Sequence, residues 1–456
     1  MESNIIGKGT FGSVRRDQDV AIKQLSNQDK EYQEEIFIVE STVCKYLTDT
    51  YTINCLAFDF NTSEISMQFG LPTLEYIKAS STHRRSAVDS LIAAVQYMHS
   101  RGLLHLDIKP ENTIVVDNHL KLLDFGLTRY IGHDLIKQGT AFSEPFRPPE
   151  LFQSKVLAYP SLDIWATGMT IYSMLTDSHV FTDYMGAELS LRDINDIFLL
   201  FIERLPNVEF PDDDKYYHGL LNTMIIYNPR RRTINKQRLV PLEIPQTPLI
   251  IKRLPERDEE ISTIDWFIQK YKEYQLSLHA LFLAVKIFYT HLDPDNVLTY
   301  VLACMKLGKI LINSWDSKLN YEILSDFTEQ GVEEDEIQIA IQKILKDGNY
   351  NLRAADSFLY FNEYQVKQAY RDETISKTFI EKLYYLMLYD GSLFALPTAL
   401  IFDTFLKLDQ GHDLNKDEKQ VHQRLIETLK EFDQAHQRRK SHKLFDQEFR
   451  EKLLEN

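Results

Sequence analysis

Two patterns of apolar and polar residues divide this chain. Up to about residue 60 apolar and polar positions alternate, apart from a helix-like stretch from about 30 to 47, and this predicts a small sheet with one helix. Between residues 85 and 240 the apolar positions recur at the helical period, as in SAVDSLIAAVQYMHS. From 260 to 456 the pattern is almost wholly helical. We therefore expect an α+β region followed by an all-α region.

Proline marks the boundary between the two regions. Positions 241, 245, 248 and 255 are all proline. Proline fixes φ and lacks a backbone N–H, so this density ends helices and makes a semi-rigid connector. A chain of 456 residues is also too long for a single hydrophobic core. We predict a first domain over 1–240 and a linker over 241–258, with two helical blocks beyond it that meet near Arg353.

Charge and cysteine content narrow the classes of partner and compartment. The net charge of −16 and the pI near 5.3 leave no basic footprint for phosphates, so no direct nucleic-acid binding is expected. No apolar run reaches the roughly 20 residues that span a bilayer, and the N-terminus lacks a signal-peptide pattern. Cys44, Cys55 and Cys304 show neither metal-ligand spacing nor a disulfide framework. We expect an intracellular protein of the cytoplasm or nucleus, neither secreted nor membrane-bound.

The segment HLDIKPEN, residues 105–112, carries the densest chemistry of the chain. Asp107, Lys109 and Asn112 place a carboxylate, a cation and an amide within six residues. These are the groups that a general base, a phosphate clamp and a metal ligand require. A second carboxylate, Asp124, follows in a DFG triplet twelve residues after Asn112. This combination points to phosphoryl transfer.

A glycine-rich segment and a lysine-bearing strand precede this loop. GKGTFGSV fits the pattern G-x-G-x-x-G-x-V, in which glycine lets the backbone approach phosphates, although a plain hairpin turn has a similar sequence. The sequence VAIK, ending at Lys23, follows on a predicted strand. The pattern positions are Gly7, Gly9, Gly12 and Val14.

These motifs together resemble those of eukaryotic-type protein kinases, in the family's order over residues 5 to 240. The resemblance implies a bilobal α+β fold with a small, mainly β N-lobe over about 1–70 and a helical C-lobe over about 71–240. It also implies ATP and Mg²⁺ as cofactors. Lysine two places after the aspartate is the serine/threonine pattern, so the implied substrates are Ser and Thr side chains of proteins.

The resemblance assigns a role to each residue of the motifs. Asp107 would accept the proton of the substrate hydroxyl, and Lys109 would steady the transferred phosphate. Asn112 and Asp124 would hold Mg²⁺. Lys23 would hold the α and β phosphates of ATP.

Lys23 needs a helix glutamate to orient it. Three candidates lie on the predicted helix, Glu34, Glu35 and Glu40. We prefer Glu40, because the corresponding kinase helix has apolar residues four and seven places further on, as this chain does.

The segment ISMQFGLPTL resembles the strand and hinge that hold adenine in kinases. Met67 would be the gatekeeper residue, and Gln68, Phe69 and Gly70 would supply backbone hydrogen bonds. An ordinary buried strand followed by a turn is the alternative interpretation.

The motif sequences are most similar to those of cyclin-dependent kinases. In that family three arginines hold a phosphorylated threonine of the activation loop. Here those positions carry Val39, Leu106 and Arg129, and the threonine position falls near Gln138. A phosphate orders a loop through paired guanidinium groups, so its receptor and its acceptor are missing together. We predict activity without activation-loop phosphorylation, with Thr140 as the alternative phosphorylation site.

Further matches lie in and after the activation segment. Ser143 matches the hydroxyl residue that touches the catalytic aspartate and lysine. Arg147 matches a residue that accompanies proline-directed specificity in cyclin-dependent kinases, although other kinases share it. Glu150, Asp163 and Arg232 match residues with structural roles in the family.

The helical half resembles cyclin boxes, on motifs much less specific than those of the kinase half. Residues 259–353 are similar to a first box, and 354–456 to a second, diverged box with a C-terminal helix. Lys309 matches a lysine that helps cyclins hold the kinase helix, whereas the partner glutamate position falls on Ile341. A generic helical bundle is the alternative.

The two resemblances together imply an intramolecular contact between kinase and cyclin-like parts. A linker of about 18 residues could span about 60 Å, more than the about 45 Å width of such a kinase domain. Tethering would raise the effective concentration to about millimolar. Two alternatives remain open, a tail that binds partners as an adaptor and a pseudokinase scaffold, and the complete set of catalytic residues argues against the scaffold. A fusion of this kind with a short N-lobe is typical of a large DNA virus or a similar streamlined genome.

Overall fold

The structure is a computed structural model that divides into two compact units, Met1–Glu243 and Ile244–Asn456. It describes residues 5–9, 12–26, 29–48, 50–132, 143–152, 158–184, 189–211, 214–237, 239–245, 248–313, 331–353, 356–362, 377–436 and 444–455. In these ranges no helix has both the length and the apolar character needed to cross a membrane.

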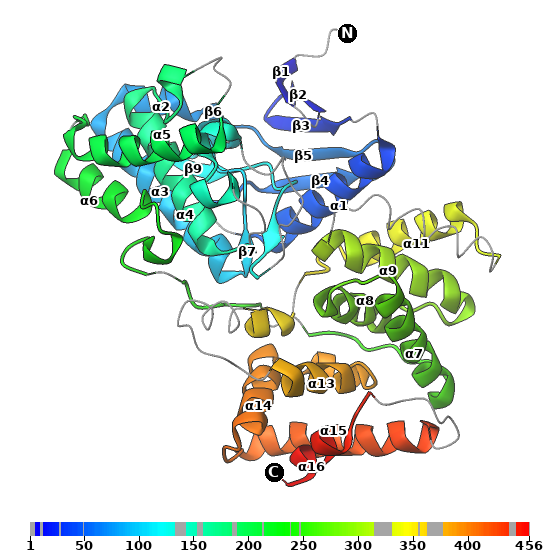
Figure 1. The fold of residues 1–456 in the computed structure, drawn as a ribbon. Helices are drawn as coiled ribbons and strands as arrows, with labels where there is room; N and C mark the ends of the chain where they lie inside the picture. Colours follow the sequence, from blue (N-terminus) through cyan, green and yellow to red (C-terminus); the bar gives the residue numbers. More distant parts are fainter. Residues whose placement is uncertain are drawn as a thin grey trace. The chain divides into compact units, whose positions relative to one another are not determined.

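A five-stranded antiparallel sheet opens the first unit (Figure 1). Its strands, in spatial order, are β1 (Ile5–Gly9), β2 (Gly12–Asp17), β3 (Val20–Leu25), β5 (Glu64–Gln68) and β4 (Cys55–Asp59). Side chains alternate along β3, so Lys23 lies on the same buried face as Ala21 and Leu25. The close pairing of β2 with β3 needs Gly12, because a Cβ there would lie 2.0 Å from the carbonyl oxygen of Gln24.

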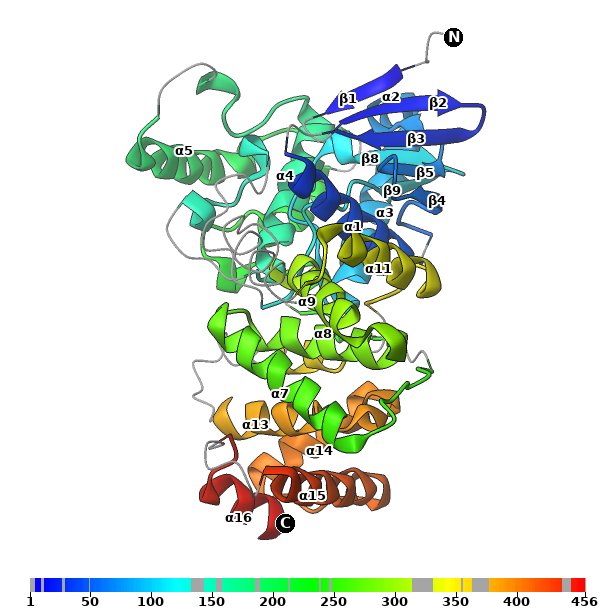
Figure 2. The same ribbon diagram turned by 90° about the vertical axis from the view of Figure 1, so that its right-hand side faces the viewer.

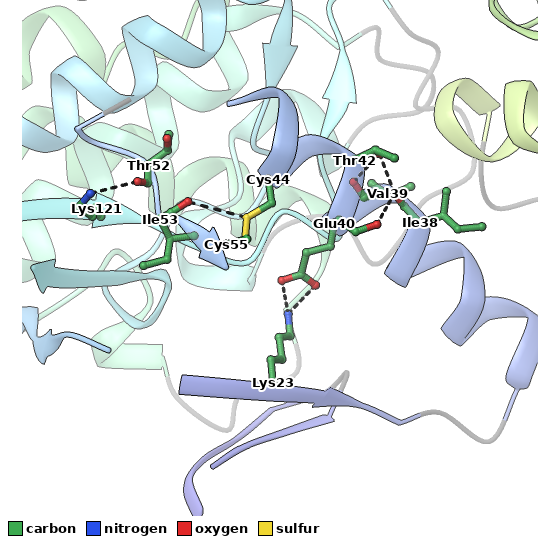
Figure 3. Close-up of a disulfide and its surroundings, with 11 residues drawn as sticks. Lys23, Ile38, Val39, Glu40, Thr42, Cys44, Thr52, Ile53, Cys55 and Lys121 are labelled. Atoms are coloured by element: carbon green, nitrogen blue, oxygen red, sulfur yellow. Dashed lines mark hydrogen bonds and ion pairs between the residues drawn. A yellow bond between two sulfur atoms is a disulfide. The ribbon is translucent and has the colours of Figure 1, made fainter. Parts of the chain in front are cut away.

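Helix α1 (Lys30–Tyr46) packs against β4 of this sheet. Asp29 caps its N-terminus by accepting hydrogen bonds from the N–H groups of Glu31 and Tyr32, which leaves fewer unpaired donors in the first turn. The helix ends at Tyr46, and the extended backbone of the capping residue Leu47 leads into the loop before β4. This packing places Glu40 of α1 opposite Lys23 of β3 (Figure 3).

A disulfide joins α1 to the sheet (Figure 3). Cys44, near the end of α1, is bonded to Cys55, the first residue of β4, and their Cα atoms are 6.1 Å apart. The expectation that the cysteines form no disulfide is therefore wrong. The sequence gives no signal for this bond, because only the packing of α1 on β4 brings together two cysteines 11 positions apart. Among the described residues Cys304 is a free, buried cysteine.

The rest of the first unit is built around the helices α3 (Ser81–Ser100) and α4 (Pro160–Thr176). Two small sheets, β6-β8-β9 and β10-β7, carry the loops between these helices. Proline at the first position of α4 suits the N-terminus of a helix, and Gly168 lets α4 approach Ile225 closely. The other elements are β6 (Leu71–Pro72), α2 (Thr73–Ala79), β7 (Leu103–Leu104), β8 (Thr113–Val116), β9 (His119–Leu122), β10 (Arg129–Tyr130), α5 (Leu191–Arg204) and α6 (Asp214–Met224).

The second unit consists of α-helices and short 3₁₀ turns in the part of the chain that the structure describes (Figure 2). Helices α8 and α9 pack very closely, because a Cβ at Gly308 of α9 would lie 2.6 Å from the carbonyl oxygen of Ala280 in α8. The first group of helices is α7 (Arg257–Glu273), α8 (Leu278–His291), α9 (Val297–Asn313) and α11 (Glu334–Asp347). The second group is α13 (Lys377–Met387), α14 (Thr398–Gln410), α15 (Lys416–His436) and α16 (Gln447–Glu455).

A buried carboxylate links the two helix groups of the second unit. Asp390 is fully buried and accepts from Arg253, which precedes α7, at 2.6 Å. It also accepts from Arg424 of α15 and, at 2.7 Å, from the hydroxyl of Ser392. Burial would raise the pKa of Asp390, but Arg424 and Ser392 outweigh it and hold the pKa below its usual value. We call Asp390, Arg253 and Arg424 the Asp390 cluster.

The predicted fold class is confirmed at this level. A small, mainly β lobe is followed by a helical lobe and then by a helical region. This order agrees with the sequence pattern, which changes from α+β in the first region to all-α in the second.

Candidate active site

The ammonium group of Lys23 lies between two carboxylates. Its Nζ is 2.8 Å from both Oε1 and Oε2 of Glu40, and 2.9 Å from Oδ1 of Asp124. The structure thus places Glu40, and not Glu34 or Glu35, against Lys23. The contact with Asp124 spans 101 positions of sequence and has no local signal in the chain. We call Lys23, Glu40 and Asp124 the Lys23 cluster.

The Lys23 cluster carries more negative than positive charge, and this shapes its protonation. Burial alone would lower the pKa of Lys23, but the attraction of Asp124 and Glu40 is larger, so its pKa is raised. Burial raises the pKa of Glu40 to about 7, opposed by Lys23 and reinforced by repulsion from Asp124. Burial also acts to raise the pKa of Asp124, but Lys23 outweighs it and the net shift is downward. Of the two carboxylates, Glu40 therefore takes up a proton more readily.

The loop between β7 and β8 gathers the predicted catalytic residues around Asp107. Lys109 Nζ donates to Oδ2 of Asp107 at 2.7 Å. The side-chain amide of Asn112 donates to the same carboxylate oxygen at 2.9 Å and to the Asp107 carbonyl at 2.8 Å. Asp107 and Asn112 are buried, which fixes their positions.

Ser143 completes this arrangement from the other side. Its backbone N–H and its hydroxyl both donate to Oδ1 of Asp107, each at 3.1 Å. The Ser143 hydroxyl accepts from Lys109 Nζ at 2.7 Å. Both oxygens of Asp107 are therefore held in place, as a positioned general base requires.

Asp163 of α4 holds the backbone of the catalytic loop through hydrogen bonds. Its buried carboxylate accepts from the N–H of His105 at 2.8 Å and of Leu106 at 2.9 Å, and it lies 3.0 Å from Nε2 of His99. Leu106 has φ of +65°, a left-handed conformation that costs roughly 1–2 kcal/mol for a residue with a Cβ. The two bonds to Asp163 hold this strained backbone and so set the direction of the next residue, Asp107.

A similar brace fixes the segment after Ser143. Arg232 donates to Glu150 through both terminal nitrogens, at 2.6 and 2.8 Å, in a bidentate pair. Its guanidinium also lies 4.8 Å from the centre of the Trp165 ring. Arg147 is half-buried, and burial lowers its pKa against the attraction of Glu144.

The predicted hinge lies at the end of β5. Met67 is buried on β5 next to the edge that Gln68, Phe69 and Gly70 continue. The N–H groups of Gln68 and Phe69 already donate within the protein, to the carbonyls of Asn54 and Asp19 at 3.2 and 3.1 Å. These two N–H groups are therefore engaged within the protein, and the N–H of Gly70 stays the predicted donor to adenine.

The glycine-rich segment belongs to two antiparallel strands, β1 and β2, over the described residues. Gly7 pairs with Val14, and Gly9 pairs with Gly12, across β1 and β2. Of these two strands, β2 lies beside β3, which carries Lys23. The backbone of this hairpin is thus placed next to the Lys23 cluster, as a phosphate-covering loop requires.

The remaining predicted activation-segment and interface residues lie in different settings. Val39 and Leu106 are both buried, and Arg129 is a buried arginine on β10 whose charge acts on the phenol of Tyr32. Gln138 and Thr140 lie outside the described residues. In the second unit Lys309 is buried on α9 and Ile341 on α11.

Oxygen ligands for a metal are present in this site. Asp124 Oδ1 binds Lys23, and its second carboxylate oxygen and the side-chain oxygen of Asn112 are hard donors of the kind that Mg²⁺ prefers. The donor set therefore fits Mg²⁺ held jointly with phosphate oxygens. No group of three or more His, Cys, Asp or Glu that could hold a metal by itself occurs among the described residues.

The lysine–glutamate pair, the glycine hairpin and the braced aspartate loop define the first unit as a phosphotransferase of the kinase type. Comparison with known families agrees, since residues 1–240 match the protein kinase domain. This is more than half of the chain, and the chain belongs to the protein kinase family.

Individual relatives are distant. The chain is 27% identical over 246 residues to the carbon catabolite-derepressing protein kinase of Candida tropicalis, covering 50% of this chain and 38% of that protein. It is 26% identical over 279 residues to human mitogen-activated protein kinase 13, covering 56% and 72%. It is 25% identical over 267 residues to the SNF1-like protein kinase ssp2 of Schizosaccharomyces pombe, covering 55% and 44%. The chain thus spans between 38% and 72% of the length of these relatives.

Proposed function

We propose that this chain is an ATP- and Mg²⁺-dependent serine/threonine protein kinase. The observation that carries the proposal is the arrangement around Asp107, where Lys109, Asn112 and Ser143 fix a buried carboxylate at 2.7 to 3.1 Å. A pseudokinase scaffold would have no use for a base held this firmly beside an assembled Lys23 cluster.

In the proposed reaction each residue acts through its position. Asp107 would accept the proton of a substrate Ser or Thr hydroxyl as the oxygen attacks the terminal phosphorus. Lys109, now bonded to Asp107 and Ser143, would follow the transferred phosphoryl group and offset its charge. Lys23, oriented by Glu40, would hold the α and β phosphates. Asn112 and Asp124 would hold Mg²⁺, which when bound supplies charge neutralisation at the phosphate oxygens.

The test is a phosphorylation assay of the intact chain with labelled ATP on an array of Ser-, Thr- and Tyr-containing peptides. We expect label on Ser and Thr peptides that requires Mg²⁺. Asp89→Asn, an exposed change on α3, serves as a matched control for Asp107→Asn. Equal labelling by the wild type and Asp107→Asn, or labelling of Tyr alone, would contradict the proposal.

We further propose that the kinase is cyclin-dependent-kinase-like and works without activation-loop phosphorylation. Leu106 supports this, because a fully buried apolar side chain replaces a phosphate-binding arginine. Val39, which is also buried, likewise stands at the position of a second phosphate-binding arginine. Phosphatase treatment and Thr140→Ala should both leave the activity of the intact chain unchanged, and loss of activity in either experiment would show that the phosphate is needed.

The helical unit is proposed to be a cyclin-like activator that holds α1 with Glu40 turned toward Lys23. The proposal is supported by the helical composition of the described residues of this unit and by the buried Lys309 on α9, at the position that matches the lysine of cyclins. The alternative is an adaptor that recruits substrates or other partners, and Ile341 in place of the cyclin glutamate favours it.

Peptide kinetics separate these two roles. An activator should raise kcat for any peptide, so a fragment of residues 1–245 should lose activity and regain it when residues 246–456 are added in trans. An adaptor should leave kcat for short peptides unchanged and alter only KM for docked protein substrates. We propose the cytoplasm or nucleus as the site of action, and proteins that the kinase phosphorylates on Ser or Thr as the partners.

A further inference from the structure

We propose that Cys44 and Cys55 form a reversible redox site that sets the position of α1, and with it the Lys23–Glu40 pair. The activity part of this inference depends on the kinase function proposed above, whereas the structural part does not. Intracellular disulfides are mostly transient and redox-sensing. A disulfide beside the centre of a kinase domain is therefore more consistent with control than with permanent stabilisation.

The bond lies one helical turn beyond Glu40. Glu40 and Cys44 are four residues apart on α1, so they lie one above the other on the same face of the helix. Figure 3 shows Glu40 directed at Lys23 and Cys44 directed at Cys55 from this one helix. Any rotation or outward shift of α1 that separated Glu40 from Lys23 would also pull Cys44 away from Cys55.

The partner cysteine is anchored to the same sheet as Lys23. Cys55 pairs with Met67 across β4 and β5, and Met67 pairs with Ala21 across β5 and β3. Lys23 lies two residues further along β3, on the same face as Ala21. The disulfide therefore connects α1 covalently to the sheet that carries Lys23. In the dithiol form non-covalent packing alone holds the helix at this point.

The two cysteines differ in accessibility in a way that suits exchange chemistry. Cys44 is only 4% exposed, whereas Cys55 is partly exposed. Their Cα separation of 6.1 Å lies in the range that a disulfide spans without backbone movement. Cys55 can therefore meet a solvent thiol or disulfide first, and Cys44 can act as the resolving partner.

The proposed oxidant is a low-molecular-weight disulfide such as glutathione disulfide, and the reductant is a thiol of the same class. The Cys55 thiol loses its proton to solvent, and its sulfur attacks the glutathione disulfide, releasing one glutathione thiolate, which is protonated. The Cys44 thiolate then attacks the Cys55 sulfur of the mixed disulfide and releases the second glutathione thiolate. The protein loses two electrons and two protons, and one glutathione disulfide becomes two thiols. Reduction follows the same steps in reverse.

The experiment compares the intact chain equilibrated in glutathione disulfide with the same chain in dithiothreitol. Alkylation followed by mass spectrometry reports whether Cys44 and Cys55 are bonded. Hydrogen exchange of the peptide covering residues 30–46 reports the mobility of α1 without reference to catalysis. Peptide phosphorylation reports activity. On reduction we expect exchange in α1 to rise and kcat/KM for ATP to fall, each by at least about fivefold, the lower end of usual coupling between sites.

Two variants sharpen the test. Cys55→Ser should show the reduced behaviour in both buffers, and Cys304→Ala, which changes a buried cysteine in the second unit, should respond to the buffers as the wild type does. If Cys55→Ser does not fold, the wild type and Cys304→Ala still decide the outcome, because both keep the cysteine pair.

Three results have distinct meanings. Full alkylation of Cys44 and Cys55 after equilibration with glutathione disulfide would overturn the proposal, because the bond would not form. A bond that forms while exchange of α1 and activity stay the same would also overturn it. A change in exchange of α1 without phosphorylation in either buffer would support the redox control of α1 and contradict the proposed kinase function.

Discussion

Two buried charge clusters, one in each unit, have opposite composition. In the Lys23 cluster two carboxylates surround one ammonium, and in the Asp390 cluster two guanidinium groups surround one carboxylate. Asp124 keeps part of its side chain exposed, whereas Asp390 is completely enclosed and also accepts from Ser392. The first cluster is left with negative charge that a metal and phosphates can use, and the second is left with no free acceptor.

This difference separates chemistry from architecture within one chain. Buried ion pairs cost desolvation, and a fully satisfied cluster serves mainly to fix which segments meet. An incompletely compensated cluster in an accessible site is a common sign of function. If the contrast is correct, equivalent changes in the two clusters should affect different measurements.

The largest effect is expected from Asp107→Asn. The amide keeps the shape of the side chain but cannot accept the hydroxyl proton, so kcat should fall about 10³-fold, within the usual range for a general base. The free energy of unfolding, measured by urea denaturation, should change little. An unchanged kcat would remove Asp107 from the reaction.

The next effect is expected from Asp390→Ala in the second unit. Arg253 and Arg424 would lose their common partner, which should lower the free energy of unfolding by about 3 kcal/mol, at the low end for a broken buried pair because both arginines are partly exposed. Asp433→Ala, which breaks a more exposed pair with Arg450, is the control and should cost less than about 1 kcal/mol. Similar losses for the two variants would mean that the Asp390 cluster is not structural.

A smaller effect is expected from pH, through Glu40. Its pKa is raised to about 7, so Glu40 is protonated and the pair with Lys23 is lost as pH falls through about 7. Between pH 8 and pH 6, kcat/KM for ATP, which reports the free enzyme, should fall about tenfold. The contribution of Glu40 to the free energy of unfolding depends on pH in the opposite sense to its contribution to activity. It is fully present below the ordinary value of 4.5 and is lost as pH rises through about 7. A flat wild-type profile, equal to that of Glu40→Gln, would contradict this assignment.

The smallest effects are expected from two matched serine changes. Ser143→Ala removes a hydroxyl that donates to Asp107, and Ser392→Ala removes one that donates to Asp390. A hydrogen bond to a charged group contributes about 1.5–3 kcal/mol. Ser392→Ala should therefore lower the free energy of unfolding by about 1.5 kcal/mol and leave kcat alone. Ser143→Ala should lower kcat about tenfold at similar stability, and the reverse result would erase the distinction between the clusters.

The sequence is most informative where chemistry demands fixed residue types at fixed spacing. Asp107, Lys109 and Asn112 lie within six residues of sequence, and the structure brings them together around one carboxylate. The change from α+β to all-α is likewise present in the periodicity of apolar residues, because burial of one face dictates it. These features are local, so a single sequence carries them.

Contacts between segments that are distant in the chain could not be predicted from the sequence. Nothing near Lys23 indicates that Asp124 is its second partner, and nothing near Cys44 distinguishes Cys55 from Cys304. Arg253 and Asp390 are 137 positions apart and belong to no motif. In each case tertiary packing, and not local preference, decides which groups meet.

The hinge has a consequence for the design of chemical probes. Many adenine-like compounds gain affinity by accepting hydrogen bonds from main-chain N–H groups, but those of Gln68 and Phe69 are already used by the carbonyls of Asn54 and Asp19. A compound that accepts from the N–H of Gly70, the third predicted hinge residue, avoids this competition. Beside the hinge, Met67 offers a flexible, polarisable wall that can adapt to a bulky substituent. Inhibitor series that accept from Gly70 and carry a hydrophobic group toward Met67 are therefore the reasonable starting point for this kinase.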